Sequence, residues 1–501
     1  MPISFSQLSL SWPDGTPCFS QLSGTIPDSV TGMIGDNGSG KSTLAKVLSH
    51  QIAPSSGTFT APEVTYLDQD LGLRDSLTIA EVFGAAEKIA ALNALEAGNY
   101  SEELLKTIGN DWDIEDRIHA CLHNAAVAYP LDRTIGTISG GEAVTIALNA
   151  AFFDHPDFVI LDEPTNNLDA AGKSKVTELI SSSSTPILVI SHDLDLLSHV
   201  EHIAELYAGS LRLFSGNYHA YREAIETEQR AAEAETREAK AEHRKQVRER
   251  EAMQVRISRD NRRGKAFSHN RRKPGMAMGN DKNRSQNTAA KRSAQASGSV
   301  QEAFAAYQAA QHKIRPDEHV HLDLPGTQLP NGTRVLTSSI VDITGPEHVR
   351  LMGPNGSGKT TFLNEVARGG VEYSLDCGYL RQKITLPEDR TILEMVTEAN
   401  PTAHPQVIRD QLAQLLFRDD QVHRRTGQLS GGERFRAEFA RVLLAEPSPQ
   451  FLLLDEPTNN LDITTIKWLV QILESYEGAY LLVSHDEGFC KQLSLSAQVH
   501  I

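Results

Sequence analysis

Cysteine is scarce in this chain of 501 residues, and long hydrophobic runs are missing from it. No apolar stretch approaches the roughly 18–20 residues that a helix needs to cross a bilayer, so a membrane-spanning protein is not expected. The start of the chain, Met1 to Phe5, shows no basic segment followed by an apolar core, and we expect no secretory signal. The four cysteines lie far apart and form no C-x-x-C pair, which disfavours a disulfide framework and a cysteine-based metal site. We therefore expect a cytoplasmic protein with reduced thiols.

Acidic residues outnumber basic ones, and the net charge of −17 would argue against nucleic-acid binding if it were spread evenly. The distribution is uneven. Between Arg256 and Arg292 the sequence holds twelve Lys or Arg and two acidic residues, a local charge of +10 that leaves −27 for the rest of the chain. A strongly basic segment within an acidic body predicts a localised contact with a polyanion.

One series of motifs occurs twice in the chain, in the same order. Residues 35–42 read Gly-Asp-Asn-Gly-Ser-Gly-Lys-Ser, and residues 353–360 read Gly-Pro-Asn-Gly-Ser-Gly-Lys-Thr. Each is followed by Ser-Gly-Gly-Glu, then by Leu-Asp-Glu-Pro-Thr-Asn-Asn-Leu-Asp, and then by Ser-His-Asp. An ordered series repeated within one polypeptide predicts two similar domains, which we place at 1–221 and 317–501.

Short apolar runs lead into these motifs. They precede the glycine-rich loops, the Asp-Glu pairs and the Ser-His-Asp segments. Such runs, bounded by loops and helical stretches, are typical of buried strands in an α/β sheet. The six runs are residues 30–34, 158–161, 187–190, 349–352, 451–454 and 480–483.

The first copy carries an insertion. Gln69 and Ser139 are 70 residues apart, whereas the equivalent Gln382 and Ser430 are only 48 apart. The excess falls within 84–130, where the patterns of 86–96 and 101–108 predict helices. We interpret this segment as a helical arm added to a copied core.

Residues 222–316, between the two copies, have a different composition. The stretch 222–260 is rich in Ala, Glu, Arg, Lys and Gln, with pairs such as Glu226 and Arg230 at helical spacing, and 291–314 also favours helix. The stretch 261–290 is basic and polar, with Gly264, Pro274, Gly275 and Gly279 interrupting regular structure. We predict a helical hairpin with a basic tip at 261–290; a flexible, solvated linker is the alternative.

The pattern Gly-x-x-x-x-Gly-Lys-Ser/Thr is typical of a phosphate-binding loop, in which backbone N–H groups and a helix N-terminus converge on phosphate oxygens. Lys41 and Lys359 are expected to contact the β- and γ-phosphates of ATP, and Ser42 and Thr360 to bind Mg²⁺. The loop residues expected to bind the nucleotide are Gly35, Asp36, Asn37, Gly38, Ser39, Gly40, Lys41, Ser42 and Thr43 in the first copy, and Gly353, Pro354, Asn355, Gly356, Ser357, Gly358, Lys359, Thr360 and Thr361 in the second.

Acidic and histidine side chains at strand ends complete the predicted chemistry. Asp162 and Asp455 are expected to hold Mg²⁺ through water, because each ends an apolar strand. An isolated Asp-Glu pair would more often be a solvated loop carboxylate, but the repeated context favours catalysis. The expected general bases are Glu163 and Glu456, and the expected γ-phosphate sensors are His192 and His485.

Three further side chains have two interpretations each. Gln69 and Gln382, each in a Tyr-Leu-x-Gln context, fit Mg²⁺ and water coordination, but also solvent-exposed loop amides. Trp12 precedes the first phosphate loop and fits either stacking on adenine or a place in the core. The second copy has no clear aromatic residue at the corresponding place.

Together, the phosphate loop, glutamine, Ser-Gly-Gly-Glu, Asp-Glu pair and histidine resemble the ATP-binding-cassette ATPases. The resemblance implies a head-to-tail sandwich of two P-loop domains within one chain, in which each ATP is capped by the Ser-Gly-Gly-Glu signature of the opposite domain. One site would combine Lys41, Asp162 and Glu163 with the signature Ser430, Gly431, Gly432 and Glu433. The other would combine Lys359, Asp455 and Glu456 with Ser139, Gly140, Gly141 and Glu142.

More narrowly, the chain resembles the ABC-F subfamily. The features that carry this resemblance are the tandem cassettes without membrane spans, the arm, the long charged linker and the segment from Phe214 to Tyr221. The resemblance implies a monomer that binds the ribosome near the tRNA exit site and directs its linker tip toward the peptidyl-tRNA and the peptidyl-transferase centre, as a translation factor or in antibiotic resistance. The tip residues expected to bind RNA are Arg262, Arg263, Arg271, Arg272 and Lys273.

Two other classes of protein share part of this pattern. A soluble ATPase subunit of an importer fits the length, but it gives no reason for the +10 segment. A nucleic-acid repair ATPase of this family would carry zinc-binding cysteine clusters, which are absent here. Within the favoured class, Thr145 follows the first signature where Arg436 follows the second, and we expect the two sites to differ in rate.

Overall fold

The computed structural model describes the chain except residues 14, 69–75, 167, 271–274, 316–325, 355, 370–374, 418 and 460. It divides into two compact units. One comprises Met1–Tyr221 together with His319–Ile501, and the other comprises Arg222–Glu318. No helix in the described part of the chain is long and apolar enough to cross a membrane.

The first cassette is built on a six-stranded sheet of order β5-β6-β7-β3-β8-β9, parallel except for the β8–β9 pair. A three-stranded antiparallel sheet of order β2-β1-β4 accompanies it. The central strands β3, β6 and β7 are buried along their whole length, which explains why they read as continuous apolar runs. The strands are β1 (Ile3–Ser11), β2 (Pro17–Ile26), β3 (Val30–Ile34), β4 (Ser56–Thr60), β5 (Val64–Leu67), β6 (Phe158–Asp162), β7 (Ile187–Ile190), β8 (His202–Tyr207) and β9 (Ser210–Ser215).

The helices of the first cassette include those of the arm. The helices expected at 86–96 and 101–108 are present as α3 and α4, which pack side by side, and Ser101 caps α4 by accepting a hydrogen bond from Leu104 N. A buried apolar cluster that includes Ile118 and Ile146 joins the arm to the helix after the signature. The helices are α1 (Lys41–Leu48), α2 (Ile79–Val82), α3 (Ala86–Glu96), α4 (Glu102–Ile108), α5 (Ile114–Asn124), α6 (Gly140–Phe152), α7 (Ala170–Ser182) and α8 (Leu194–Leu197).

The second cassette repeats this plan with a parallel five-stranded sheet of order β13-β14-β15-β12-β16 and an antiparallel β10–β11 pair. In its core Trp468 makes edge-on contacts with both Phe435 and Phe439. The strands are β10 (Thr333–Thr337), β11 (Asp342–Gly345), β12 (His348–Met352), β13 (Cys377–Leu380), β14 (Phe451–Asp455), β15 (Ala479–Val483) and β16 (Ala497–His500). The helices are α11 (Lys359–Ala367), α12 (Ile392–Ala399), α13 (Pro405–Gln414), α14 (Gly431–Leu443), α15 (Ile463–Ser475) and α16 (Glu487–Cys490).

The predicted fold class is confirmed, because each cassette is an α/β domain whose apolar runs form parallel strands. The phosphate loops follow β3 and β12, the Asp-Glu pairs follow β6 and β14, and the Ser-His-Asp segments follow β7 and β15. Carboxyl ends of neighbouring parallel strands meet at one edge of a sheet. The topology therefore brings all three motifs of each cassette to the same edge.

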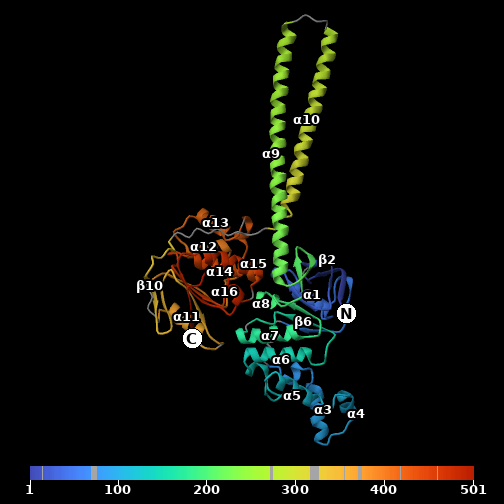
Figure 1. Cartoon of the computed structure of the whole chain (residues 1–501), viewed down its shortest axis with the longest axis vertical. Coiled ribbons are helices and arrows are strands. Elements are labelled where there is room, and N and C mark those ends of the chain that lie inside the picture. Colours follow the sequence, from blue (N-terminus) through green and yellow to red (C-terminus); the bar gives the residue numbers. More distant parts are fainter. Residues whose placement is uncertain are drawn as a thin grey trace. The chain divides into compact units, whose positions relative to one another are not determined.

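The second unit is a hairpin of two long helices, α9 (Tyr218–Asn270) and α10 (Gly275–Gln311), which run side by side in Figure 1. Lys313 Nζ contacts Glu235 Oε1 at 2.8 Å, and Arg315 N donates to Gln229 Oε1 at 2.8 Å. The expectation that 261–290 interrupts regular structure is wrong for most of that stretch, because α9 continues to Asn270 and α10 begins at Gly275. An interior glycine such as Gly264 lowers helix stability by only about 1 kcal/mol, which a long helix tolerates.

Candidate active sites

The first phosphate loop wraps around its own lysine. Lys41 is the first residue of α1, and its Nζ donates to the carbonyl oxygens of Gly35 and Asp36 at 2.7 and 3.0 Å. Gly38 and Gly40 have φ of 81° and 96°, a left-handed backbone that favours glycine. Gly40 also starts α1 without a side chain to cap it, so the N–H groups of the first turn can donate to an anion.

The second phosphate loop has the same construction. Lys359 Nζ donates to the carbonyl oxygens of Gly353 and Pro354 at 2.7 and 2.8 Å. Gly356 and Gly358 have φ of 81° and 96°, matching the first loop. Asn355 lies outside the described residues. The repeated motif therefore produces the same local geometry in both cassettes.

Each loop opens on a cavity of about 330 Å³. Its size and donor set fit a nucleotide, because such pockets typically occupy about 300–1,000 Å³. The first cavity is lined by residues that include Trp12, Lys41, Ser42, Thr43, Glu163 and His192. The second is lined by residues that include Lys359, Thr360, Thr361, Gln382, Glu456 and His485.

The first cavity settles one of the alternatives raised by the sequence. Trp12 is 45% exposed and lines the first cavity, so its alternative placement in the core is wrong. Gln382 is exposed in a loop and also lines the second cavity, which fits both of its interpretations. Gln69 lies outside the described residues. In both loops the hydroxyl of the inner serine, Ser39 or Ser357, is buried without a hydrogen-bond partner among the described residues, as a site built for further polar ligands would leave it.

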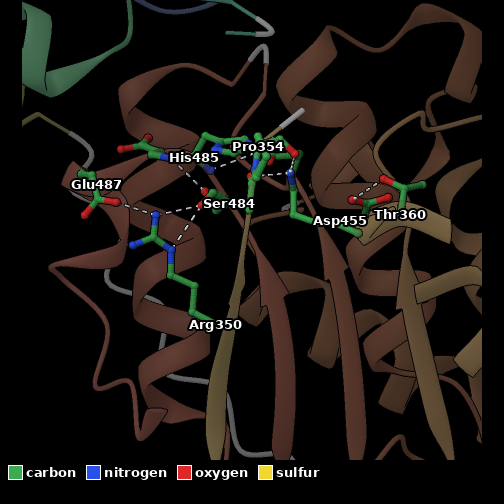
Figure 2. Close-up of polar contacts among 11 residues, drawn as sticks. Arg350, Pro354, Thr360, Asp455, Ser484, His485 and Glu487 are labelled. Atoms are coloured by element: carbon green, nitrogen blue, oxygen red, sulfur yellow. Dashed lines mark hydrogen bonds and ion pairs between the residues drawn. The ribbon is translucent and has the colours of Figure 1, made fainter. Parts of the chain in front are cut away.

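A hydroxyl and a carboxylate meet in each site. Thr360 Oγ1 donates to Asp455 Oδ1 at 3.2 Å (Figure 2), and the hydroxyl of Ser42 lies close enough to Asp162 to offset part of the rise in its pKa. Burial is the main cause that raises the pKa of both aspartates. Hydroxyl and carboxylate oxygens are ligands that Mg²⁺ accepts, so these pairs fit a magnesium site.

Two tyrosines that the sequence did not single out also contact these aspartates. Tyr66 donates to Asp162 Oδ2 at 3.0 Å, and Tyr379 donates to Asp455 Oδ2 at 3.4 Å. Both belong to the Tyr-Leu-x-Gln segments, whose repetition was the signal that could have identified them. They hold the carboxylates from the neighbouring strands β5 and β13.

The glutamate after each aspartate has an unusual backbone. Glu163 and Glu456 have φ of 50° and 46°, and their N–H groups donate to Ile190 O and Val483 O, each at 2.8 Å. A left-handed conformation costs a non-glycine residue about 1–3 kcal/mol, and the adjacent strand holds it in place. This conformation presents both carboxylates to the cavities.

A histidine faces each glutamate. His192 Nε2 lies 3.4 Å from Glu163 Oε1, and His485 Nε2 lies 3.5 Å from Glu456 Oε1. Burial, and then the nearby Asp162, raise the pKa of Glu163 to about 8; burial also raises the pKa of Glu456. Burial and then the phosphate-loop lysines lower the pKa of His192 to about 3 and that of His485 to about 4. Both imidazoles are therefore neutral near pH 7 and carry one N–H donor each.

The Ser-Gly-Gly-Glu signatures begin helices. Ser139 is the N-cap of α6 and donates to Glu142 Oε2 at 2.6 Å, and Ser430 forms a reciprocal capping box with Glu433 at the start of α14. Ser-x-x-Glu before a helix is a capping-box pattern, a signal that the sequence carries beside the family motif. The caps place both signatures at helix N-termini; Ser139 and Gly140 are exposed in the first, whereas Gly432 is buried in the second.

The first phosphate loop contacts the second cassette. Asn37 N donates to Asp462 Oδ2 at 2.9 Å, and Thr464 Oγ1 donates to Asp36 Oδ1 at 3.0 Å. A methyl group built on Gly431 would lie 4.0 Å from Asn37 Nδ2, so the second signature is also adjacent to this loop. Asp462 is the last residue of the repeated Leu-Asp-Glu-Pro-Thr-Asn-Asn-Leu-Asp motif, which was a signal for it; no motif pointed to Thr464, whose partner lies in the other half of the chain.

Two phosphate loops, each with its carboxylates, histidine and helix-capping signature, define a tandem nucleotide-binding protein of the P-loop class. A family model described as ABC transporter matches residues 20–166 and 336–459, more than half of the chain. The chain belongs to the ATP-binding-cassette family and, within it, to the ABC-F group.

Curated relatives match along most of the chain. The tylosin resistance ATP-binding protein TlrC of Streptomyces fradiae is 31% identical over 517 residues, which cover 94% of this chain and 92% of that protein. ABC transporter F family member 5 of Arabidopsis thaliana is 26% identical and covers 92% and 69%. ATP-binding protein Uup of Escherichia coli K12 is 27% identical and covers 91% and 73%.

Solved structures share the fold. The match in the crystal structure of the complex of archaeal ribosomal stalk protein aP1 and archaeal ribosome recycling factor aABCE1 has a TM-score of 0.58 at 17% identity, and it covers 99% of this chain and 89% of that one. The structure of RNase-L Inhibitor has a TM-score of 0.55 at 18% identity, with 98% and 86% covered. At these identities the likeness concerns the fold of the two cassettes.

Proposed function

We propose that this chain binds ATP with Mg²⁺ at two sites, hydrolyses it, and uses the cycle to act on the ribosome. The observation that carries the proposal is the duplicated cavity of about 330 Å³, which in each cassette gathers a phosphate-loop lysine, a glutamate and a histidine. The same three groups meet at the same strand ends twice, which a structural role alone would not require.

In each site the lysine and the N–H groups of the loop would bind the phosphates. Mg²⁺ would be held by Ser42 and Asp162 in the first site, and by Thr360, Asp455 and Gln382 in the second; when bound, it neutralises charge on the phosphate oxygens. In the first site, Gln69 would bind Mg²⁺ as Gln382 would in the second.

Hydrolysis would depend on the glutamate and histidine pairs. In their ionised form Glu163 and Glu456 would accept a proton from the attacking water, and His192 and His485 would each donate their ring N–H to the terminal phosphate. The backbone geometry supports these roles, because the strained φ at both glutamates aims their carboxylates into the cavities.

ATP would complete each site across the two cassettes. The contacts of Asn37 with Asp462 and of Asp36 with Thr464 support a sandwich in which the second signature, Ser430 to Glu433, caps the first ATP. By the repeat symmetry, Ser139 to Glu142 would cap the second. A shift from 1:99 to 99:1 between open and closed forms takes about 5.5 kcal/mol of differential binding, which two nucleotides can share.

The ribosomal role rests on relatives and on charge. One relative is a tylosin resistance protein, and a fold neighbour is an archaeal ribosome recycling factor. The local charge of +10 between Arg256 and Arg292 supports contact with rRNA and tRNA phosphates by the linker. We propose that ATP-driven closure places the linker against peptidyl-tRNA near the peptidyl-transferase centre, and that hydrolysis releases it.

Sedimentation of a trapped variant tests the proposal. Glu163→Gln combined with Glu456→Gln should bind ATP without turning it over, and should then move into the 70S or 50S fraction of a sucrose gradient. The same variant without nucleotide is the control. If the ATP-bound variant stays at the top of a low-salt gradient, the ribosomal role is wrong.

A further inference from the structure

A buried arginine reaches the histidine loop of the second site. Arg350 lies in the middle of β12 and is 2% exposed. Its Nε and Nη2 donate to the carbonyl oxygen of Ser484 at 3.2 and 2.9 Å, and Nη2 also contacts Glu487 Oε1 at 2.6 Å. Figure 2 shows the guanidinium pointing at the segment that contains Ser484, His485 and Glu487.

Arg350 and Glu456 contact two consecutive residues of this segment, Ser484 and His485. Ser484 directly precedes His485, so the guanidinium fixes the carbonyl of the peptide group whose N–H belongs to the histidine. That N–H donates to Glu456 Oε2 at 3.2 Å. The peptide group between residues 484 and 485 is therefore anchored at its oxygen by Arg350 and at its nitrogen by the expected general base.

The first cassette has a glycine where the second has this arginine. Gly32 stands three residues before Gly35, as Arg350 stands three before Gly353. A methyl group built on Gly32 would lie 2.6 Å from Leu197 Cδ2 and 3.2 Å from Ile203 Cδ1, so apolar side chains already fill the space.

Two positions near this arginine are also more polar in the second cassette than in the first. Counted from the serine of each Ser-His-Asp segment, Glu487 corresponds to Leu194, and Cys490 corresponds to Leu197. Arginine, glutamate and cysteine in the second cassette thus stand where the first has glycine and two leucines. The sequence therefore gives this polar set to the second cassette and an apolar set to the first.

Stability does not account for a charge at this place. A buried ion pair often adds nothing to stability compared with well-packed apolar side chains of similar volume, and the first cassette has such packing at the same position. The guanidinium instead fixes the orientation of the Ser484 carbonyl, because its N–H donors lie in one plane and point in set directions.

We propose that Arg350 is a positioning residue for the second nucleotide site: oriented by Glu487, it holds the Ser484 carbonyl and thereby sets the place of His485. The proposal rests on the phosphate-sensing role proposed above for His485. In both sites the backbone N–H of the histidine bonds the glutamate, so the two sites then differ in what lies at the carbonyl before the histidine: apolar packing in the first and the guanidinium in the second.

Hydrogen exchange of the full-length protein tests the anchor without requiring hydrolysis. The variant Arg350→Gly with Glu487→Leu and Cys490→Leu gives the second cassette the apolar set of the first, so packing is kept and the hydrogen bonds to Ser484 are removed. Amides of 484–489 should exchange about tenfold faster, while those of 191–196 should not change. Arg441→Met, which breaks the pair of Arg441 with Glu438 on α14, is the control and should affect neither segment.

Glu487→Gln is a milder second variant, since the Glu487 side chain is 43% exposed and the change keeps its volume. It should raise exchange in 484–489 in the same direction by a smaller factor. Unchanged exchange in 484–489, or equal changes in both segments, would overturn the proposal.

Single-site kinetics test the consequence for catalysis. In a Glu163→Gln background, which leaves the second site to hydrolyse ATP, the triple variant should lower kcat on the order of tenfold, because a small misplacement of a group that contacts the reacting phosphate is costly. In a Glu456→Gln background the same change should leave kcat unaltered. An equal loss in both backgrounds would indicate general destabilisation and would refute a positioning role.

A double variant separates positioning from packing. Once His485→Ala has removed the histidine, removing Arg350 as well should lower kcat no further; additive effects would contradict the proposal. If no form of the protein hydrolysed ATP, the proposed enzymatic function would fail, whereas the hydrogen-exchange result would still decide the role of Arg350.

Discussion

The backbone N–H of Asn37 donates a hydrogen bond of 2.9 Å to Oδ2 of Asp462, 425 residues further along the chain. The other oxygen of the same carboxylate accepts from Thr465 N at 2.8 Å and so caps α15. One side chain thus fixes the start of a helix in the second cassette and contacts the phosphate loop of the first. A change at the start of α15 can therefore alter the position of the first phosphate loop.

We predict that Asp462→Ser lowers first-site hydrolysis about tenfold, since hydrogen bonds to charged groups contribute about 1.5–3 kcal/mol. Serine still caps α15 but is too short to reach Asn37, so stability should hardly change. Steady-state ATPase assays in the Glu456→Gln background measure this effect. Asp169→Ser, the equivalent change in the first cassette, is the control; a similar loss from both variants in this background would contradict the prediction.

The pair of Lys173 and Asp193 should support the first cassette. Lys173 Nζ lies 2.9 Å from Asp193 Oδ2, and the two side chains are 23% and 8% exposed. The equivalent of Lys173 in the second cassette is Ile466. We predict that Lys173→Ile lowers the free energy of unfolding by about 2 kcal/mol, less than the full 3–5 kcal/mol for breaking a buried pair, because the lysine is partly solvated.

Thermal unfolding checks this prediction, with a midpoint lowered by about 4–8 °C. Lys175→Ile, two residues further along α7, is a control for the removal of a lysine. Restoring the midpoint by adding Asp193→Asn would support the unpaired carboxylate as the cause, whereas no change in Lys173→Ile would show that solvent already replaces the ion pair.

His348 should make stability depend on pH. Its ring stacks on Tyr480 at 4.1 Å between centroids, and burial lowers its pKa from 6.5, although the carbonyls of Gly478 and Ser494 and the charge of Glu474 act in the opposite direction. A depressed pKa in the folded state means that the unfolded chain binds the proton more readily. The stability is therefore present above about pH 6.5 and is lost as the pH falls through the folded pKa.

The variant His348→Phe should remove this part of the pH dependence while it keeps the stacking on Tyr480. The midpoint of thermal unfolding, compared between parent and variant from pH 7.5 down to pH 4.5, should fall more steeply for the parent. Parallel curves would show that His348 does not titrate between the folded and unfolded states in this range.

The linker tip should contribute the salt dependence of ribosome binding. We predict that replacing Arg262, Arg263, Arg271, Arg272 and Lys273 by Ala weakens binding and reduces the slope of log K against log salt by about 0.7–0.9 for each phosphate that is no longer neutralised. ATP hydrolysis by the free protein should change little. Arg230→Ala is the matched control, because this exposed arginine lies on α9, as Arg262 and Arg263 do, but outside the basic segment. Arg271, Arg272 and Lys273 lie outside the described residues. Equal slopes for parent and five-residue variant would refute phosphate binding by the tip.

The sequence predicted what depends on local pattern. The apolar runs became β3, β6 and β7 and their counterparts, and the glycine-rich loops follow β3 and β12 and lead into helices, because both depend on side-chain burial and chain geometry at neighbouring residues. The two arm helices at 86–96 and 101–108 were likewise predictable, since their propensity and capping are contained within a few residues.

Contacts between distant residues could not be predicted from one sequence. Asp462 and Thr464 acquire their importance from a loop in the other cassette, and Arg350 looks like a misplaced charge in an apolar strand until Ser484 and Glu487 are seen beside it. The predicted helical hairpin is present, but its two helices extend further into 261–290 than we expected. Gly264 and Gly279 lie within α9 and α10, because single residues of low propensity do not stop a long helix, whereas Pro274 lies outside the described residues.

The left-handed backbones of Glu163 and Glu456 lower the stability of both cassettes. Glycine adopts such a φ without strain, so exchanging either glutamate for glycine would relax the chain at the place where the water-activating carboxylate is proposed to act. Each cassette thus carries its strained backbone at the residue that is proposed to activate water, so such an exchange should make the fold more stable and remove the proposed base in one step.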